Sequence, residues 1–247
     1  MLKDYKNHVQ ERLQQGIPPL ALNAEQVSDL VDLLKSPPKG EEDYILDLIT
    51  NRTPAGVDPA AYVKAGFLTA IAKGETTSPL IDKEHATTLL GTMLGGYNVE
   101  SLIGLLEDEE VGQIAAEGLS KTLLMFNAKH DVIELAQKNS NAKRVVDSWS
   151  NAEWFTSRPK LPEIIKAIVF RVEGEINTDD LSPAPDAPSR PDIPLHALAM
   201  LKKTMENPIA TIEKLKESGL PVVFVGDVVG TGSSRKSATN SLLWHIG

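Results

Sequence analysis

Short amphipathic segments, each closed by proline or glycine, fill the first 155 residues and limit the fold more than any other feature of the sequence. In residues 24–35, apolar residues recur at the spacing that lines one face of a helix, namely Val27, Leu30, Val31 and Leu34, and a Ser-Pro-Pro-Lys-Gly sequence then ends the segment. Roughly nine such segments follow one another, with no alternating strand pattern. Short helices joined by tight turns form either a stack of helix pairs or a closed bundle. The irregular spacing is compatible with a degenerate repeat, and we favour the stack.

The character of the sequence changes near Pro159. Residues 164–176 are rich in β-branched side chains and predict a strand, and residues 221–229 form an apolar run that predicts a buried strand. Two helices are predicted between them, over 195–207 and 209–219. The predicted fold class is therefore an all-α helical repeat domain followed by an α/β domain.

Composition excludes several functions. The chain of 247 residues has no cysteine, so it offers no thiolate nucleophile and no cysteine ligand for zinc or an iron–sulfur cluster. Its net charge of −9 argues against broad binding of nucleic acid through phosphate contacts. No apolar run approaches the roughly 20 residues of a membrane helix, and the polar N-terminus lacks the apolar core of a secretory signal. These features predict a cytoplasmic protein with no membrane partner and no metal site of its own.

A glycine-rich loop leads from the second predicted strand into a helix, an arrangement that often binds anions through free backbone N–H groups and the helix dipole. Arg235 stands where a Walker A loop needs glycine and where a dinucleotide fingerprint needs its third glycine, so neither nucleotide is favoured. Gly230 and Gly232 with Ser233, Ser234 and Arg235 suit a small carboxylate, because arginine grips carboxylates with two hydrogen bonds. The alternative is that a serine simply caps the helix and Arg235 is solvated.

The segment NTDDLSPAPDAPSRPDIP, residues 177–194, carries five prolines in eighteen residues and could be an extended connector on composition alone. Together with GDVVGTGSSRKSATN, residues 226–240, it resembles the aconitase superfamily, and within it the bacterial aconitase B branch. In that branch a helical HEAT-like domain precedes a swivelling β/α domain and the cluster-carrying domains. The resemblance implies a HEAT-like domain over residues 1–157 and the first, incomplete part of a swivelling domain over 158–247. It also implies that the chain is an N-terminal fragment, inactive alone, whose downstream aconitase domains are its partners.

The resemblance implies an activity as well. The family interconverts citrate and isocitrate through cis-aconitate in the tricarboxylic acid cycle, and 2-methylisocitrate is a further candidate substrate. In the full-length protein a 4Fe-4S cluster binds the departing hydroxyl, and its ligands would lie outside this chain, which is expected to bind no cofactor. By motif, Ser233 would be the base, as an alkoxide stabilised at the helix N-terminus. Asp179 would assist proton handling at the leaving hydroxyl; its alternative is a turn-forming cap beside Pro183.

Several residues would hold substrate carboxylates by the same resemblance. Arg190, Ser234 and Arg235 would grip them directly, and the Thr-Asp-x-x-Ser segment would add Thr178 and Ser182. A competing interpretation makes the chain a helical interaction module. The resemblance supports that reading too, because the HEAT-like domain of the family is linked to homodimer formation and to mRNA binding. The acidic balance of the chain gives the mRNA reading no direct support.

Overall fold

The computed structural model describes residues 1–123 and 125–247; Leu124, which the sequence places in the helical part, lies outside the described residues. The chain forms two compact units. The first comprises Met1–His8 and Pro19–Pro159, and the second comprises Val9–Pro18 and Lys160–Gly247. The division runs through helix α1 (Leu2–Gln14). The predicted domain boundary at residue 157, and the type assigned to each domain, stay predictions.

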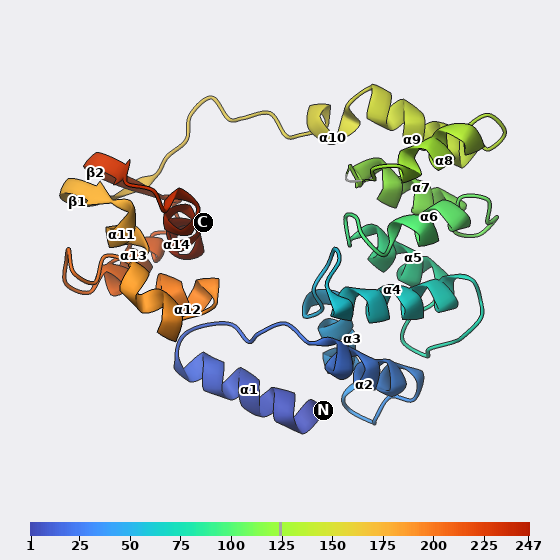
Figure 1. Ribbon diagram of the computed structural model, residues 1–247, viewed down its shortest axis with the longest axis horizontal. Helices are drawn as coiled ribbons and strands as arrows, with labels where there is room; N and C mark the ends of the chain where they lie inside the picture. Colours follow the sequence, from blue (N-terminus) through green and yellow to red (C-terminus); the bar gives the residue numbers. More distant parts are fainter. Residues whose placement is uncertain (124) are drawn as a thin grey trace. The chain divides into compact units, whose positions relative to one another are not determined.

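The first unit is a stack of short helices (Figure 1). Helix α4 packs against α2 and α5, and α7 packs against α5 and α9, while α3, α6 and α8 lie beside this row. Within the described residues before Pro159, β structure is limited to one isolated bridge between Gly56 and Gly96. The predicted helical character of this part is therefore confirmed. The helices are α2 (Ala24–Lys35), α3 (Glu42–Asn51), α4 (Pro59–Ala72), α5 (Lys83–Gly91), α6 (Val99–Leu105), α7 (Gly112–Lys121), α8 (Ala128–Leu135), α9 (Ser140–Ser150) and α10 (Glu153–Thr156).

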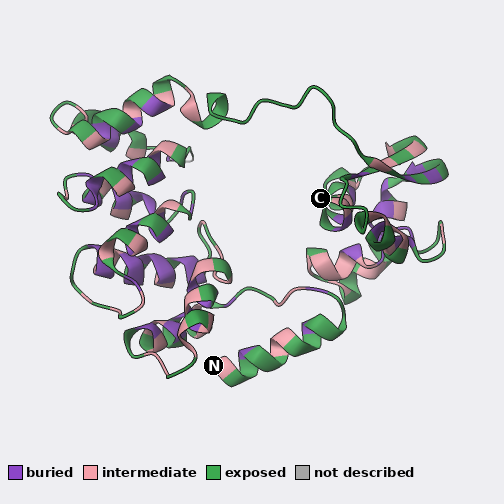
Figure 2. Cartoon of the chain, turned by 180° about the vertical axis from the view of Figure 1, so that it is seen from behind, coloured by how far each residue is buried: buried purple, intermediate pink, exposed green. Residues whose placement is uncertain are grey.

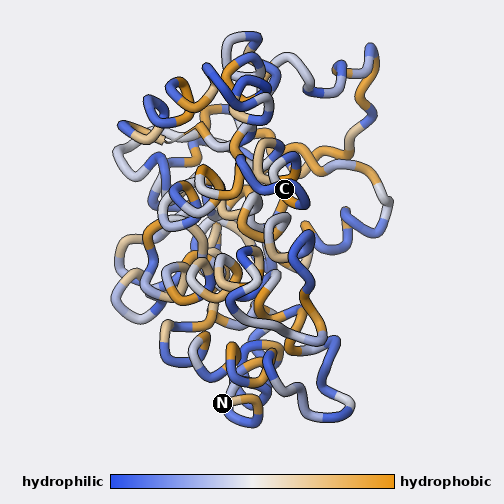
Figure 3. The backbone as a smooth tube through the Cα atoms, turned by 90° about the vertical axis from the view of Figure 1, so that its right-hand side faces the viewer, coloured by the Kyte–Doolittle hydropathy of each residue, from blue (hydrophilic) through white to orange (hydrophobic). Residues whose placement is uncertain are grey.

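Local sequence explains where these helices begin. The Asn23 side chain accepts a hydrogen bond from the Gln26 amide, and the Gln26 side chain accepts one from the Asn23 amide. These two bonds form a capping box at the start of α2. Asp58 caps α4 with Pro59 as the first helical residue, and Asp82 caps α5. From α2 to α9 the buried apolar side chains face neighbouring helices, so buried residues gather along the inside of the stack (Figure 2). Figure 3 shows that hydrophobic and hydrophilic residues are interspersed along the backbone.

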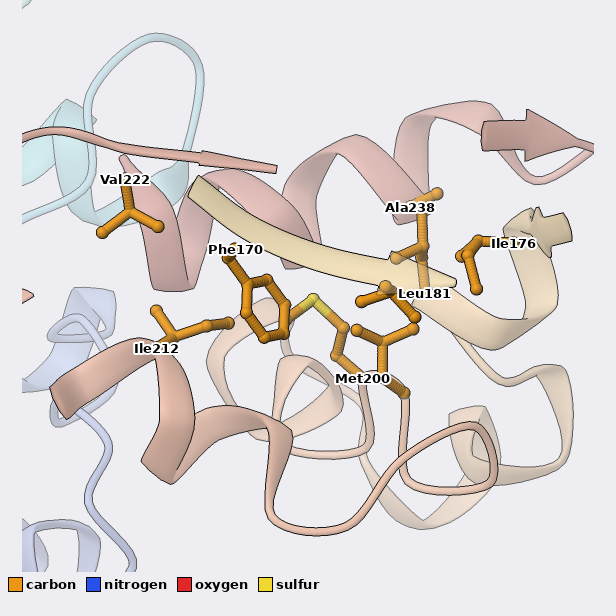
Figure 4. Close-up of a cluster of buried hydrophobic side chains, with 9 residues drawn as sticks. Phe170, Ile176, Leu181, Met200, Ile212, Val222 and Ala238 are labelled. Atoms are coloured by element: carbon orange, nitrogen blue, oxygen red, sulfur yellow. The ribbon is translucent and has the colours of Figure 1, made fainter. Parts of the chain in front are cut away.

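The second unit is built on two parallel strands, β1 (Ile168–Asn177) and β2 (Val222–Thr231). One face of this sheet covers a core that includes Phe170, Ile176, Met200 and Ile212 (Figure 4). The strands pair from Ile168 opposite Val222 to Asn177 opposite Thr231, with register shifts between Val172 and Glu175 and after Ile176, and their carboxyl ends lie at the same edge. The remaining elements are α11 (Thr178–Leu181), the 3-10 helix η1 (Ala184–Ser189), α12 (Ile193–Ala197), α13 (Pro208–Lys216) and α14 (Arg235–Ile246). An α/β part therefore follows the helical part, as predicted.

Local predictions for this unit are only partly right. The helix predicted over 195–207 ends at Ala197, because Leu201 adopts a positive φ of 58° and donates its amide to the Asp180 carbonyl. The proline-rich segment 177–194, which could be an extended connector on composition alone, contains α11 and η1. The strand predicted to be buried leaves Val223, Val225 and other valines exposed, because core side chains cover only one face of the sheet. Among the described helices, none has the length and apolarity needed to cross a membrane.

Candidate functional site

The two segments singled out in the sequence meet where the parallel strands end. Strand β1 finishes at Asn177 opposite Thr231 of β2; β1 leads directly into α11, and β2 leads into α14 through the loop of residues 232–234. The Thr178 hydroxyl, at the start of α11, accepts a hydrogen bond from the Ser234 amide at 3.2 Å. Parallel strands place the loops that follow them at one edge of the sheet, which is where open α/β sheets bind ligands. Residues 56 positions apart in the chain thus form one structure.

Gly232 makes this approach possible. Its φ of 106° lies in a region that L-residues rarely adopt, and a Cβ built on it would stand 2.5 Å from the Thr178 hydroxyl. Both conditions select glycine. The residues of this loop predict a site for a small carboxylate, and the structure shows that the loop backbone is held tightly against α11.

The carboxylates beside Thr178 have different surroundings. The Asn177 side chain caps α11 by accepting hydrogen bonds from the amides of Asp179 and Asp180, at 2.8 and 2.9 Å, and the Asp180 carboxylate accepts one from the Asn177 amide. Asn177 and Asp180 thus form the capping box of α11. Asp180 also accepts from the Thr204 hydroxyl. The Asp179 side chain is exposed, and the capping box does not use its carboxylate.

Residues 232–234, which lead into α14 and are called the serine loop below, lie at the surface of the unit. Ser233 and Arg235 are exposed, and Ser234 occupies the N-cap position without a capping bond from its side chain. Two backbone amides are already used, because Ser234 donates to Thr178 and Arg235 donates to the Ser233 carbonyl at 2.9 Å. The first-turn amides that lack an intrahelical acceptor by position are those of Lys236 and Ser237. An anion at this helix would therefore meet side chains and these two amides rather than the whole loop backbone.

Ser182 lies one turn beyond Asp179 and is buried. It faces a cavity of about 100 Å³ whose walls are mostly polar. The cavity also reaches the side of α14 that follows the serine loop. Its other lining residues are Pro191, Asp192, Ile193, His196, Ser237, Asn240 and Ser241.

Arg190 is fixed elsewhere in the unit. Its Nη1 donates to the Leu195 carbonyl at 3.0 Å, and its Nε lies 3.8 Å from a carboxylate oxygen of Asp186. Lys202 also binds Asp186, at 2.6 Å, and holds the pKa of that carboxyl below its usual value. Among the described residues, no hydrogen bond or ion pair joins Arg190 to Ser233 or Arg235. The structure thus joins the Thr178 and serine-loop segments but keeps Arg190 outside their hydrogen bonds.

Sequence reasoning missed the partner that anchors the Arg190 segment. Asp192 caps α12 and forms a two-pronged ion pair with Arg12 of α1. The aspartate was readable as a cap, since it precedes Ile193 and Pro194 at the start of a helix. Nothing in the sequence pairs it with an arginine 180 positions away.

The described residues offer no metal centre of their own: none of their histidine, aspartate and glutamate side chains gather in groups of three or more that could hold an ion. Cysteine is absent from the sequence. One of the five histidines, His245, is buried in the second unit with its Nε2 3.0 Å from the Ala197 carbonyl, and burial lowers its pKa. The residues present therefore do not fit an iron–sulfur cluster.

Comparison with known proteins agrees with a two-part chain that carries these motifs. The family described as the aconitate B N-terminal domain matches residues 4–155, and the family described as the aconitate hydratase 2 N-terminus matches residues 167–247. The chain therefore belongs to the aconitase B family, through the N-terminal parts of these enzymes.

Curated relatives match over the whole chain. Aconitate hydratase B of Pseudomonas aeruginosa is 61% identical over 258 residues, and the alignment covers 100% of this chain and 30% of the relative. Aconitate hydratase B of Synechocystis is 59% identical over 249 residues, and that of Helicobacter pylori is 51% identical over 248; each alignment covers 100% of this chain and 29% of the relative. The chain thus spans about 30% of the length of the relatives it matches.

Proposed function

We propose that this chain is the N-terminal part of an aconitate hydratase, a hydro-lyase that interconverts citrate and isocitrate through cis-aconitate. The observation that carries the proposal is the contact between Thr178 and the Ser234 amide, which unites the two segments that resemble the family's site. In the same enzyme, 2-methylisocitrate is a further candidate substrate. The metabolic setting would be the tricarboxylic acid cycle, and the location would be the cytoplasm.

Ser233 is the proposed base. A serine hydroxyl accepts a carbon-bound proton only as an alkoxide, so its negative charge must be stabilised. The exposed loop places Ser233 at the N-terminus of α14, where the helix dipole and the positive side chains of Arg235 and Lys236 favour an anion. Asp179, exposed and free of the α11 cap, is the group proposed to handle the proton of the leaving hydroxyl.

The substrate is a tricarboxylate, so its binding requires several residues that bind carboxylate groups. Arg235 and Ser234 at the serine loop are proposed to hold one carboxylate, with Arg190 supplying a second grip. Thr178 already accepts the Ser234 amide, and its hydroxyl hydrogen stays available to donate. Ser182 is buried at the polar cavity beside α14 and completes the proposed set. Each charge-assisted hydrogen bond of this kind contributes about 1.5–3 kcal/mol.

The 4Fe-4S cluster that the family implies belongs to the rest of the full-length protein. This chain has neither cysteine nor a described group of metal-binding side chains, so it ligates no part of that cluster. The chain alone is accordingly expected to be inactive. Its role in the full-length enzyme would be to supply the base and the carboxylate-binding residues.

The helical unit would serve the same protein as a HEAT-like domain. A stack of helix pairs with two rows is the arrangement that such repeats form, which supports this assignment. Formation of a homodimer through this unit, and mRNA binding, remain the alternative function implied by the family. No contact or charge pattern in the described residues favours either one.

The test is mutagenesis of the serine loop in the full-length enzyme that carries this sequence. Ser233→Ala should lower kcat by far more than it raises KM for citrate, because it removes the proton acceptor itself. Arg235→Lys should mainly raise KM, because a point charge replaces a two-pronged grip. Ser218→Ala, at an exposed serine after α13, serves as the control and should change neither constant.

The pattern across the variants decides the assignment. If Ser233→Ala keeps a near-normal kcat while Ser234→Ala loses it, the base has been placed one residue too early. If neither serine matters, the loop is only the start of a helix, and the proposed chemistry is wrong. Measurable turnover of citrate by the isolated chain after treatment with iron and sulfide would contradict its role as a part of the enzyme.

A further inference from the structure

Arg12 is the most firmly bound arginine in the second unit. Its Nη1 and Nη2 donate to the two carboxylate oxygens of Asp192 at 2.9 and 3.0 Å, and its Nε donates to the Pro18 carbonyl at 2.8 Å. Only 8% of its side chain is exposed. Three of its five donors are thus directed by the fold, and the planar fork leaves Asp192 one orientation. The same pairing holds the pKa of Asp192 below its usual value.

Asp192 passes this constraint to one residue, Leu195. Its Oδ1 accepts the Leu195 amide at 2.9 Å, as the N-cap of α12. The carbonyl of the same Leu195 accepts Nη1 of Arg190 at 3.0 Å. A continuous series of hydrogen bonds therefore runs from Arg12 through Asp192 and Leu195 to the guanidinium of Arg190.

We infer that Arg12 is a positioning residue that sets the orientation of Arg190 for substrate binding. The inference rests on the proposed function, in which Arg190 grips a substrate carboxylate. A guanidinium that must meet a carboxylate with two hydrogen bonds has to be held within a few tenths of an ångström and a few tens of degrees. The Leu195 carbonyl holds Arg190, and Arg12 determines where the first turn of α12, and so that carbonyl, lies.

A purely structural role explains the ion pair less well. Burying an arginine and a carboxylate removes both from water, and the attraction between them often does no more than balance that cost. What a buried two-pronged pair adds is a fixed geometry. This geometry is imposed two residues from Arg190, on the helix turn to which Arg190 binds.

The experiment uses the full-length enzyme that carries this sequence, with citrate as the probe. Arg12→Met should raise KM for citrate by about tenfold, the scale of one weakened charge-assisted hydrogen bond, and change kcat by less than twofold. Asp192→Asn should act in the same direction. Because asparagine caps helices as well as aspartate does, that variant keeps α12 and removes the charge that Arg12 binds.

Arg144→Met is the matched control. Arg144 also forms an ion pair at 2.8 Å, with Glu153, but it lies on α9 of the helical unit and its side chain is 57% exposed. This variant should leave KM unchanged. Thermal unfolding of each variant shows whether the second unit still folds, and Asp192→Asn provides the measurement if Arg12→Met does not.

A double-mutant cycle separates positioning from general loss of structure. In an Arg190→Ala background, Arg12→Met should add nothing to KM, because the group that it positions is gone. A second measurement does not depend on enzyme activity. In the chain of 247 residues, Arg12→Met should speed hydrogen exchange of the Leu195 amide, because this amide donates to Asp192, which Arg12 holds in place.

Each other outcome has a definite meaning. If Arg190→Ala raises KM but neither Arg12→Met nor Asp192→Asn does, Arg12 has no positioning role and the proposed function stands. If the effects of Arg12→Met and Arg190→Ala multiply, Arg12 acts independently of Arg190 and the inference is overturned. If Arg190→Ala itself leaves KM unchanged, the substrate grip assigned to Arg190 is wrong, and the inference is overturned with it.

Discussion

Lys64 is a buried cation in the helical unit, and its replacement should stabilise the protein. It lies on α4 with 3% of its surface exposed, and among the described residues its Nζ donates one hydrogen bond, to the Thr50 carbonyl at 3.4 Å. Burial lowers its pKa from the usual 10.5 to about 8. Removing the amine with Lys64→Met keeps a long, unbranched side chain while eliminating the desolvated charge.

The magnitude follows from the pKa. A lowering of the pKa from 10.5 to about 8 corresponds to about 3 kcal/mol, since each unit of pKa difference between the folded and unfolded states is worth about 1.4 kcal/mol. Below pH 8 the lysine is charged in both states, and the folded protein carries the full penalty. Between pH 8 and 10.5 the unfolded state binds more protons than the folded state, so stability rises with pH in this window. Above 10.5 the penalty is gone.

The assay is urea unfolding, followed by far-ultraviolet circular dichroism, at pH values from 7 to 10.5. The difference in unfolding free energy between Lys64→Met and the unsubstituted chain should be largest at pH 7, about 3 kcal/mol, and should shrink as pH rises through 8. Taking the difference cancels groups that titrate equally in both proteins. Lys73→Met, at the exposed C-cap of the same helix, should change stability by less than about 0.5 kcal/mol at every pH.

Two results would refute this reasoning. A destabilised Lys64→Met at pH 7 would show that the bond to Thr50, or the packing of the side chain, outweighs the desolvation of the charge. A stabilisation that does not change with pH would show that the gain comes from better packing and that the lysine is neutral or hydrated in the folded state.

Two further predictions concern glycines at close contacts. Gly118→Ala on α7 should destabilise the helical unit by about 1–3 kcal/mol in urea unfolding, because its Cβ would stand 2.8 Å from the Gly91 Cα of α5. Gly104→Ala on α6, where nothing lies within 4 Å, should be neutral or stabilising, and equal effects at both sites would contradict the close contact. Gly232→Ala should destabilise the second unit by about 1–3 kcal/mol more than Gly230→Ala, since both require a positive φ but only the former meets the Thr178 hydroxyl. A difference of zero in thermal unfolding would mean that the serine loop can move away from α11.

Local signals in the sequence predicted the helical part well. Helix starts at Asn23 and Asp58 follow from side chains that bond amides two or three residues away, and these contacts need no knowledge of the fold. The motifs around Thr178 and Ser233 were likewise readable, because a strand, a short loop and a helix are contiguous in the chain. Their resemblance to a known family extended the prediction to residues such as Arg190, whose role no local pattern indicates.

Local sequence patterns gave wrong predictions where contacts between distant residues determine the structure. The predicted helix over 195–207 has suitable residues, yet it ends at Ala197 because the Leu201 amide bonds to Asp180 across the unit. The second strand is apolar enough to be buried, but burial depends on what covers each face of the sheet, and one face of β2 is exposed. Neither outcome can be read from a window of neighbouring residues.

By itself the sequence determined the order of a helical part and an α/β part, the absence of cysteine chemistry and the family to which the chain belongs. These properties depend on composition, on periodicity and on short motifs, all of which are local. The tertiary structure decided which distant groups meet: Thr178 with the Ser234 amide, and Arg12 with Asp192. Such contacts join residues 56 and 180 positions apart, and only the packing of the core brings them within hydrogen-bond distance.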